Sequence, residues 1–157
     1  MPRIGVISDT HNCLDSQVAD IFAGVGAIIH AGDIGQPKIL TELSVLAPVT
    51  AVLGNTDDPI FGWPDTELVA LHGQRFLVHH IVDPLRLRPS LSRLIASEHP
   101  NFVVFGHTHQ PYKGWHDGVF FLNPGSAGSG RFGLPRTVAI IDLSPDRFEV
   151  IFHELGA

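Results

Sequence analysis

The sequence predicts an α/β fold formed by a single domain over residues 1–157, and three observations support this prediction. The first half of the chain alternates short apolar runs with helical patterns, as in the βαβ units that build a parallel sheet. The second half contains mostly apolar runs separated by turn residues, with one helical pattern. A length of 157 residues with 44% hydrophobic and 17% charged residues suits a globular chain with one core.

The first half contains three expected strands and two expected helices. Val18, Ile21 and Phe22 have helical spacing. Pro37 suits the first turn of the next helix, because a proline gives up no needed hydrogen bond there. The expected strands are residues 3–8, 27–30 and 49–53, and the expected helices are residues 16–22 and 37–46.

The second half begins with an expected hairpin over residues 66–79. Its two apolar runs, 66–71 and 74–79, flank His72 and Gly73. A helical pattern over residues 90–98 follows. The remaining expected strands are residues 102–105, 119–123, 137–143 and 148–154.

Charge and cysteine content exclude several classes of protein. A net charge of −6 argues against general nucleic-acid binding, which requires clustered Lys and Arg. The single cysteine, Cys13, excludes an internal disulfide. The N-terminal sequence lacks a signal-peptide pattern, and no apolar run approaches the 18 residues of a membrane span. We therefore expect a cytoplasmic protein that does not bind membranes. Whether it forms a homo-oligomer is left open by the sequence.

Residue types that bind metals follow five of the expected strands. The carboxyl ends of parallel strands meet at one edge of a sheet, where ligands bind. In chain order these residues are Asp9, His11, Asp33, Asn55, Asp57, His79, His80, His107 and His109. If two of these carboxylates, the amide and four of the five histidines are ligands, they exceed the four ligands of tetrahedral zinc and suit two metals about 3.5–4 Å apart. Oxygen and nitrogen ligands without thiolate favour Mn²⁺, Fe, Ni²⁺ or Zn²⁺, of which we expect Mn²⁺.

Five short motifs occur in the order of a known family. They are Asp-Thr-His at 9–11, Gly-Asp at 32–33, Gly-Asn at 54–55, a histidine at the end of a strand, and Gly-His-Thr-His at 106–109. This order resembles the calcineurin-like metallophosphoesterase superfamily. Asn-Pro-Gly-Ser at 123–126 resembles its small single-domain prokaryotic phosphodiesterase branch. The resemblance implies a four-layer α/β/β/α sandwich.

The resemblance also divides the ligands between two metals. The implied ligands are Asp9, His11 and His109 for one metal, Asn55, His79 and His107 for the other, and Asp33 as the bridge. We prefer His79 to His80 because it directly follows the apolar strand, although an exchange of the two stays open. Asp57 matches an acidic residue of the family that supports a ligand histidine.

The implied activity is that of a metal-dependent phosphoric ester hydrolase, and we expect a phosphodiesterase. A hydroxide bridging the two metals would attack a small phosphate ester, with Asp33, Asn55 and His80 as catalytic residues. Many members of the family carry a histidine that aids substrate binding or protonates the leaving group where this chain has Thr56. The expected substrate contacts are therefore Thr56, His80 and Arg131, and His80 or His116 could replace the missing acid. A phosphomonoesterase or nucleotidase and a non-catalytic scaffold, as in the retromer subunit with this fold, are the alternatives.

Overall fold

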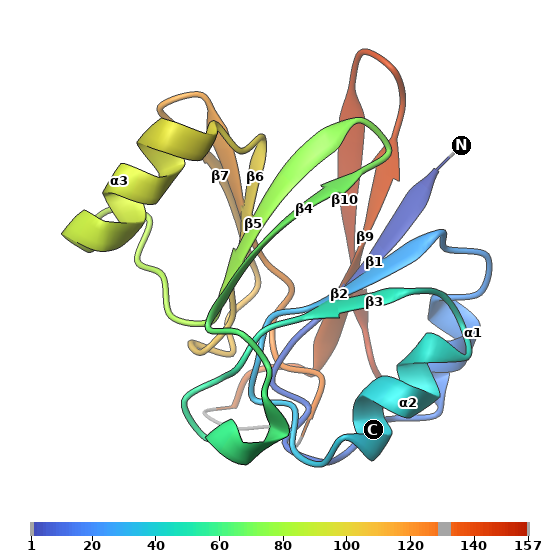
Figure 1. Ribbon diagram of the computed structural model, residues 1–157. Coiled ribbons are helices and arrows are strands. Elements are labelled where there is room, and N and C mark those ends of the chain that lie inside the picture. The colour runs from blue at the N-terminus through green and yellow to red at the C-terminus, as the bar shows by residue number, and fades with distance from the viewer. Residues whose placement is uncertain (1, 129–132, 157) are drawn as a thin grey trace.

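The computed structural model describes residues 2–128 and 133–156, which form two five-stranded sheets packed face to face (Figure 1). The first sheet consists of β1 (Arg3–Ile7), β2 (Ala27–His30), β3 (Val49–Ala51), β9 (Thr137–Leu143) and β10 (Phe148–Glu154), in the order β10-β9-β1-β2-β3. The second sheet consists of β4 (Thr66–Leu71), β5 (Gln74–His79), β6 (Phe102–Val104), β7 (Tyr112–His116) and β8 (Val119–Asn123), in the order β4-β5-β6-β8-β7.

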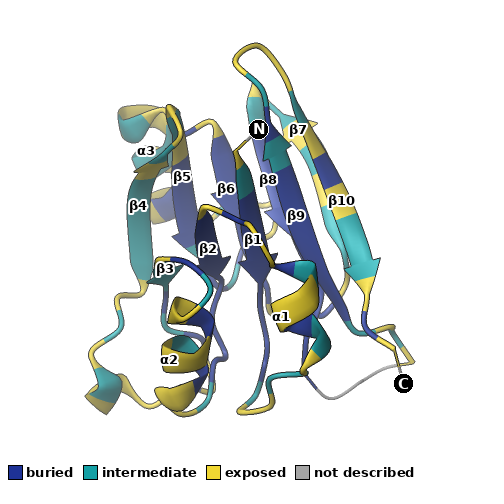
Figure 2. Ribbon diagram, turned by 90° about the vertical axis from the view of Figure 1, so that its right-hand side faces the viewer, coloured by how far each residue is buried: buried dark blue, intermediate teal, exposed yellow. Residues whose placement is uncertain are grey.

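Helices cover the outer face of each sheet. The helices are α1 (Gln17–Ile21), α2 (Lys38–Ser44) and α3 (Pro89–Glu98), and a short 3-10 turn, η1, spans Pro59–Phe61. Apolar residues of α1 and α2 pack against the first sheet, and those of α3 pack against the second. Figure 2 shows that α1 and α2 are exposed on the side that faces away from the buried strands β1, β2 and β9. These four layers confirm the predicted α/β/β/α sandwich.

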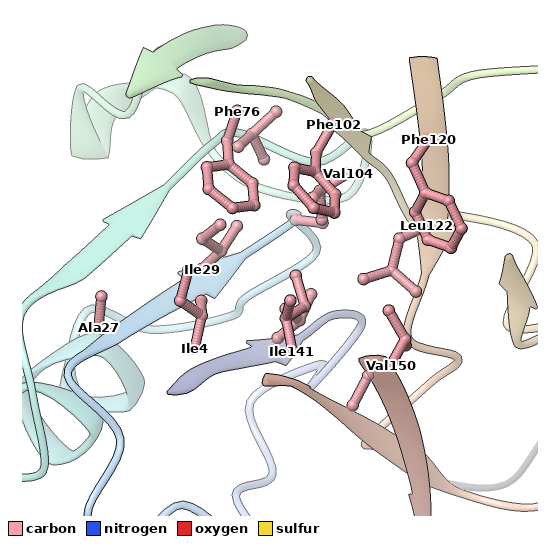
Figure 3. Close-up of a cluster of buried hydrophobic side chains, with 14 of the residues drawn as sticks. Ile4, Ala27, Ile29, Phe76, Phe102, Val104, Phe120, Leu122, Ile141 and Val150 are labelled. Atoms are coloured by element: carbon pink, nitrogen blue, oxygen red, sulfur yellow. The ribbon is translucent and has the colours of Figure 1, made fainter. Parts of the chain in front are cut away.

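The core between the sheets uses alternate residues of each strand, because side chains in a strand point alternately to its two faces. In β5, Phe76 and Val78 point into this core, whereas Leu77 belongs to the cluster under α3. Phe76 stacks on Phe102 with ring centroids 4.6 Å apart (Figure 3). Even-numbered residues of β5 therefore face the first sheet, and odd-numbered residues face α3.

The parallel strands of both sheets deliver their following loops to one edge of the molecule. Strands β1, β2 and β3 are parallel neighbours, and so are β5, β6 and β8. Figure 2 shows the arrowheads of β1, β2 and β5 pointing to the same end. The motifs that follow these strands in the sequence are thereby brought together.

The structure adds one strand to those expected. Residues 112–116 form β7, which pairs with β8 alone at the edge of the second sheet. Gly114 lies within it and Pro111 precedes it, so its sequence lacks the apolar run that marks the central strands. The expected hairpin is confirmed, and His72 and Gly73 both have positive φ, of 50° and 81°, as its two-residue turn requires. Within residues 2–128 and 133–156, no helix is long and apolar enough to cross a membrane.

Candidate metal centre

Side chains from five loops converge at the edge between the two sheets. Each loop directly follows a strand that runs toward this edge. The converging residues are Asp9 and His11 after β1, Asp33 after β2, Asn55 after β3, His80 after β5, and His107 and His109 after β6. The loops of two different sheets therefore build one site.

The first group of potential ligands is Asp9, His11 and His109. Nε2 of His109 lies 3.2 Å from Oδ1 of Asp9, and Nε2 of His11 lies 3.6 Å from the same oxygen. The two Nε2 atoms are 3.4 Å apart. One oxygen and two ring nitrogens thus face a single point.

The second group is Asp9, Asp33 and His80, so Asp9 is common to both groups. Nε2 of His80 lies 3.3 Å from Oδ2 of Asp33 and 3.9 Å from Oδ1 of Asp9. Oδ2 of Asp33 is also 3.8 Å from Nε2 of His11, which places this oxygen between the two groups. Nδ1 of His80 donates to the carbonyl oxygen of Ala31 at 2.7 Å, so the lone pair of Nε2 points toward the carboxylates in the neutral ring.

Asn55 and His107 lie next to each other at the same edge. Nδ1 of His107 is 3.0 Å from Oδ1 of Asn55, and the His80 and His107 rings are 5.4 Å apart. The backbone N–H of His107 donates to Oδ2 of Asp9 at 3.1 Å. This pair therefore lies beside His80 of the second group.

The two neighbouring histidines after β5 are arranged in the reverse of the expected order. His79 lies outside both ligand groups, and its Nδ1 is 2.8 Å from Oγ1 of Thr66 on the adjacent strand. By alternation along β5, His80 is on the same side as Phe76 and Val78, which face the first sheet. His79 is on the side of Leu77, which faces α3. The site lies between the sheets, so only the even-numbered residue reaches it. The position next to the apolar run therefore does not bring His79 into either group of potential ligands.

Burial and ion pairing set the charges of the cluster. Burial alone would raise the pKa values of Asp9 and Asp33, but the nearby imidazoles of His11 and His80 and hydrogen bonds from Ser8 and the N–H of Thr56 outweigh it and lower both. Burial alone would lower the pKa of His80, but the adjacent carboxylates of Asp33 and Asp9 raise it instead. The pKa of His79 is lowered, mainly by burial. The aspartates are therefore ionised, and their negative charge favours a cation at this site.

Two buried atoms in the cluster show that its residues fit a divalent metal. Oδ1 of Asp9 and Nε2 of His80 have no hydrogen-bond partner among the described residues. Buried polar atoms are almost always hydrogen-bonded. Here imidazole nitrogens approach Oδ1 to 3.2, 3.6 and 3.9 Å without forming hydrogen bonds, which is the arrangement of ligands around a cation. Cys13 is exposed and belongs to neither ligand group, so the donors are oxygen and imidazole nitrogen.

The loops that carry these residues have unusual backbone conformations. Non-glycine residues with positive φ are uncommon, and strained backbone concentrates at functional sites. Five potential ligands have positive φ, namely Asp9, His11, Asp33, His107 and His109, with values from 46° to 72°. The hydrogen-bond network of the loops holds this conformation, which turns successive side chains back toward one point. Sequence reasoning did not find this feature, because its only signal is the occurrence of Asp, Asn and His after the strands.

Two glycines allow the loops to approach closely. A Cβ atom on Gly54 would collide with the backbone nitrogen and Oδ1 of Asp33. A Cβ atom on Gly106 would collide with Oγ of Ser8 and would lie 2.6 Å from Oδ2 of Asp9. The glycines of the Gly-Asn and Gly-His-Thr-His motifs therefore make room for the two carboxylates.

Asp57 ties two of the loops together. Its carboxylate accepts hydrogen bonds from the backbone N–H groups of Ile34, Gly35 and Gly54 at 2.8 to 3.1 Å. We had expected Asp57 to support a ligand histidine, but its hydrogen bonds go to backbone amides. It fixes the loop of Asp33 against the loop of Asn55.

His30 connects the loops after β1 and β2 from behind the site. It is fully buried, and burial lowers its pKa to about 3, so its ring is neutral. Its Nδ1 accepts from the N–H of Gly32, and the proton on Nε2 is therefore donated to Oγ1 of Thr10, 3.0 Å away. The Thr10 hydroxyl in turn donates to the carbonyl oxygen of Ile34.

Replacing His30 should destabilise the protein without removing a metal ligand. In His30→Ala, the N–H of Gly32 and the hydroxyl of Thr10 lose a buried partner, and each such loss costs about 1–3 kcal/mol. Urea unfolding of the metal-free protein measures this change in the free energy of unfolding. His72→Asn is the matched control, because His72 is exposed and Asn tolerates its positive φ of 50°. An unfolding midpoint of His30→Ala equal to that of the control would refute the connecting role.

The remaining predicted residues have different positions. The backbone N–H of Thr56 donates to Oδ1 of Asp33 at 2.9 Å, so Thr56 touches the centre through its main chain. Arg131 lies outside the described residues. His116 is on β7, where its Nε2 forms a short hydrogen bond with the Tyr112 hydroxyl.

Known proteins resemble this chain in sequence and in fold. The probable metallophosphoesterase of Methanothermobacter thermautotrophicus is 35% identical, over 98% of this chain and 93% of that protein. A solved archaeal phosphodiesterase is similar with a TM-score of 0.77 and 26% identity, over 96% of this chain and 99% of that one. A Vps29 of Entamoeba histolytica, solved in complex with Zn²⁺, has a TM-score of 0.75 over 97% of this chain and 98% of its own. Its identity is 19%, so this likeness concerns the fold alone.

A family profile covers most of the chain. The profile of the calcineurin-like phosphoesterase superfamily domain matches residues 2–146. This match confirms the resemblance seen in the motifs and, at the level of the family, the expected class of metal-dependent phosphoric ester hydrolases. The chain belongs to the calcineurin-like phosphoesterase superfamily.

Proposed function

We propose that the protein is a phosphodiesterase with two divalent metal ions in the centre described above. The observation that carries this proposal is the pair of overlapping ligand groups that share Asp9, with Asp33 between them. Asp9, His11 and His109 would hold one ion, and Asn55, His80 and His107 the other. Asp33 would bridge them, because its Oδ2 lies within 3.8 Å of a histidine from each set.

The residues of the chain have distinct roles in this proposal. When bound, two divalent cations would activate a water molecule as the nucleophile and stabilise the charge on the phosphoryl oxygens. The carboxylates of Asp9 and Asp33 hold the positive charge in place, and neutral imidazoles complete the ligand sets. Ala31 fixes the orientation of the His80 ring through its carbonyl oxygen. Mn²⁺ is the ion we propose, with Fe, Ni²⁺ and Zn²⁺ as alternatives.

The non-catalytic scaffold is the second candidate. The likeness to Vps29 supports it only at the level of fold. The convergence of both carboxylates with four imidazoles favours catalysis, because a scaffold does not require buried ligand atoms without hydrogen-bond partners. Four expectations stay predictions: location in the cytoplasm, a small phosphate ester as substrate, no nucleic-acid partner, and a homo-oligomer as an open alternative.

The proposal is tested by metal reconstitution. Protein freed of metal with a chelator is reloaded with Mn²⁺, Ni²⁺, Zn²⁺ or Mg²⁺ and assayed with bis(4-nitrophenyl) phosphate and with 4-nitrophenyl phosphate. We expect no hydrolysis by the metal-free protein, recovery with Mn²⁺, and a higher kcat/KM for the diester. A higher kcat/KM for the monoester would favour a monoesterase, and absence of hydrolysis with every metal would favour the scaffold.

The rate should depend steeply on the leaving group. Thr56 occupies the position of the histidine that many family members use, and His80 would be a metal ligand in this proposal, so neither would offer a free acid. A general acid commonly contributes about 10²–10⁴-fold, mostly for poor leaving groups. We expect kcat of aryl phosphodiesters to rise as the leaving-group pKa falls, and Thr56→His to reduce that slope. A flat profile in the unaltered protein would mean that another residue already donates the proton.

A further inference from the structure

An apolar pocket of about 500 Å³ opens beside the metal centre on the side of His107. The loops after β5 and β6 and the start of β7 form its walls. Its apolar lining consists of Ile81, Val82, Pro84, Phe105, Pro111 and Tyr112. Pockets for small molecules commonly measure about 300–1,000 Å³ and are lined mainly by apolar and aromatic side chains. The pocket is therefore large enough for an aromatic ring.

The walls of this pocket are already ordered without a ligand. Val82 and Phe105 are buried and belong to the apolar cluster under α3. Tyr112 is held in two ways, because its hydroxyl bonds to His116 and its ring lies 6.1 Å from that of Phe105. A ring that enters the pocket thus meets a preformed surface, which lowers the entropic cost of binding.

A second pocket of about 410 Å³ also borders the centre, and its lining has more charged residues. It includes Asn55, His80 and the exposed Arg88. Both pockets contain Ile81, and each contains a proposed metal ligand. A phosphodiester has two organic groups, and the two pockets offer them different surroundings.

We propose that the apolar pocket binds an aromatic group of the substrate, so that aryl phosphodiesters are the preferred substrate class. This inference rests on the proposed function, because the phosphate must be held at the metal centre for one of its ester groups to extend past His107 into the apolar pocket. The second pocket is the poorer site for such a ring, because its lining includes the charged side chains of Asp57, Asp65 and Arg88, which an apolar ring would partly remove from water. Tyr112 is the specificity-determining residue of this arrangement.

The first test measures binding without metal. Phenol is titrated into the metal-free, ¹⁵N-labelled protein while backbone amide shifts are recorded. We expect the shifts to concentrate in residues 81–85 and 105–112. An aromatic pair contributes about 0.5–1.5 kcal/mol, so Tyr112→Ala should weaken phenol binding about 2- to 10-fold. Shifts spread evenly over the protein would overturn the proposal.

Matched variants separate the pocket from general effects on the strand. Trp115 lies on β7 but packs against Phe120 and Phe148 on its other face, so Trp115→Ala should leave phenol binding unchanged. Ile81→Asn alters the same pocket from another loop and serves if Tyr112→Ala fails to fold. Equal weakening in Trp115→Ala and Tyr112→Ala would contradict the assignment.

The second test uses the Mn²⁺-loaded enzyme and two esters with the same leaving group. We expect a higher kcat/KM for phenyl 4-nitrophenyl phosphate than for methyl 4-nitrophenyl phosphate, and a smaller ratio in Tyr112→Ala. Equal values in the unaltered enzyme would overturn the preference while leaving the proposed function intact. Phenol binding in the pocket without hydrolysis under any metal would support the aryl site and overturn the proposed function.

Discussion

Asp33→Ala should abolish hydrolysis and weaken the binding of both metal ions. Oδ2 of Asp33 lies 3.3 Å from Nε2 of His80 and 3.8 Å from Nε2 of His11, so its loss removes the oxygen between the two ligand sets. The activity should fall by more than the roughly 10–100-fold that loss of a supporting outer group commonly costs. Elemental analysis after gel filtration, together with kcat/KM for bis(4-nitrophenyl) phosphate, measures both effects.

Asp9→Ala is the matched comparison for this prediction, because Asp9 also belongs to both ligand groups. Only Oδ1 of Asp9 is directed at the histidines, since Oδ2 accepts hydrogen bonds from Ser8 and His107. We expect Asp9→Ala to lose one ion preferentially and Asp33→Ala to lose both. If Asp33→Ala retains two ions while Asp9→Ala retains none, Asp9 is the bridge.

His80→Ala should lose one metal ion and nearly all activity, whereas His79→Ala should keep both ions. By alternation along β5, His80 is on the side that faces the first sheet. Its Nε2 is buried without a hydrogen-bond partner among the described residues. His79 lies outside both ligand groups, and its Nδ1 is 2.8 Å from Oγ1 of Thr66. The pair is an internal control, because the two substitutions remove the same side chain from neighbouring positions.

The measurement is the metal content of the two variants at equal, sub-saturating Mn²⁺. Circular dichroism of the metal-free proteins establishes that both are folded. A metal-deficient His79→Ala beside a fully loaded His80→Ala would restore the order that adjacency to the apolar run had suggested. Loss of metal in both would mean that the loop after β5, rather than one ring, is required.

Strands could be predicted from the sequence where their burial produces a recognisable run of apolar residues. Central strands such as β2 and β9 are buried on both faces and have continuous apolar runs. The edge strand β7 has alternately half-buried and exposed residues around Gly114, and this pattern is too weak to separate it from a turn. The four-layer arrangement came from the resemblance to a family, because strand order between two sheets depends on contacts distant in sequence.

The members of the site could be predicted, but their orientation could not. The ends of five strands identified Asp9, Asp33 and the histidines of the Gly-His-Thr-His motif, because parallel strands bring their ends together. The choice between His79 and His80 required knowing which face of β5 meets the other sheet. Alternation divides the residues of β5 between two faces but does not say which face meets the other sheet. The large apolar side chains of Phe76 and Val78 could have indicated that their face points into the core between the sheets. The backbone partners of Asp57 depend on loops with positive φ, which the sequence does not define.

The central claim is that one chain holds two metal ions between these loops, and anomalous diffraction from crystals loaded with Mn²⁺ tests it directly. We expect two peaks about 3.5–4 Å apart. The first peak should contact Asp9, His11 and His109, and the second should contact Asn55, His80 and His107, with Asp33 touching both. A single peak, or a second peak that does not touch Asp33 and His80, would contradict the account.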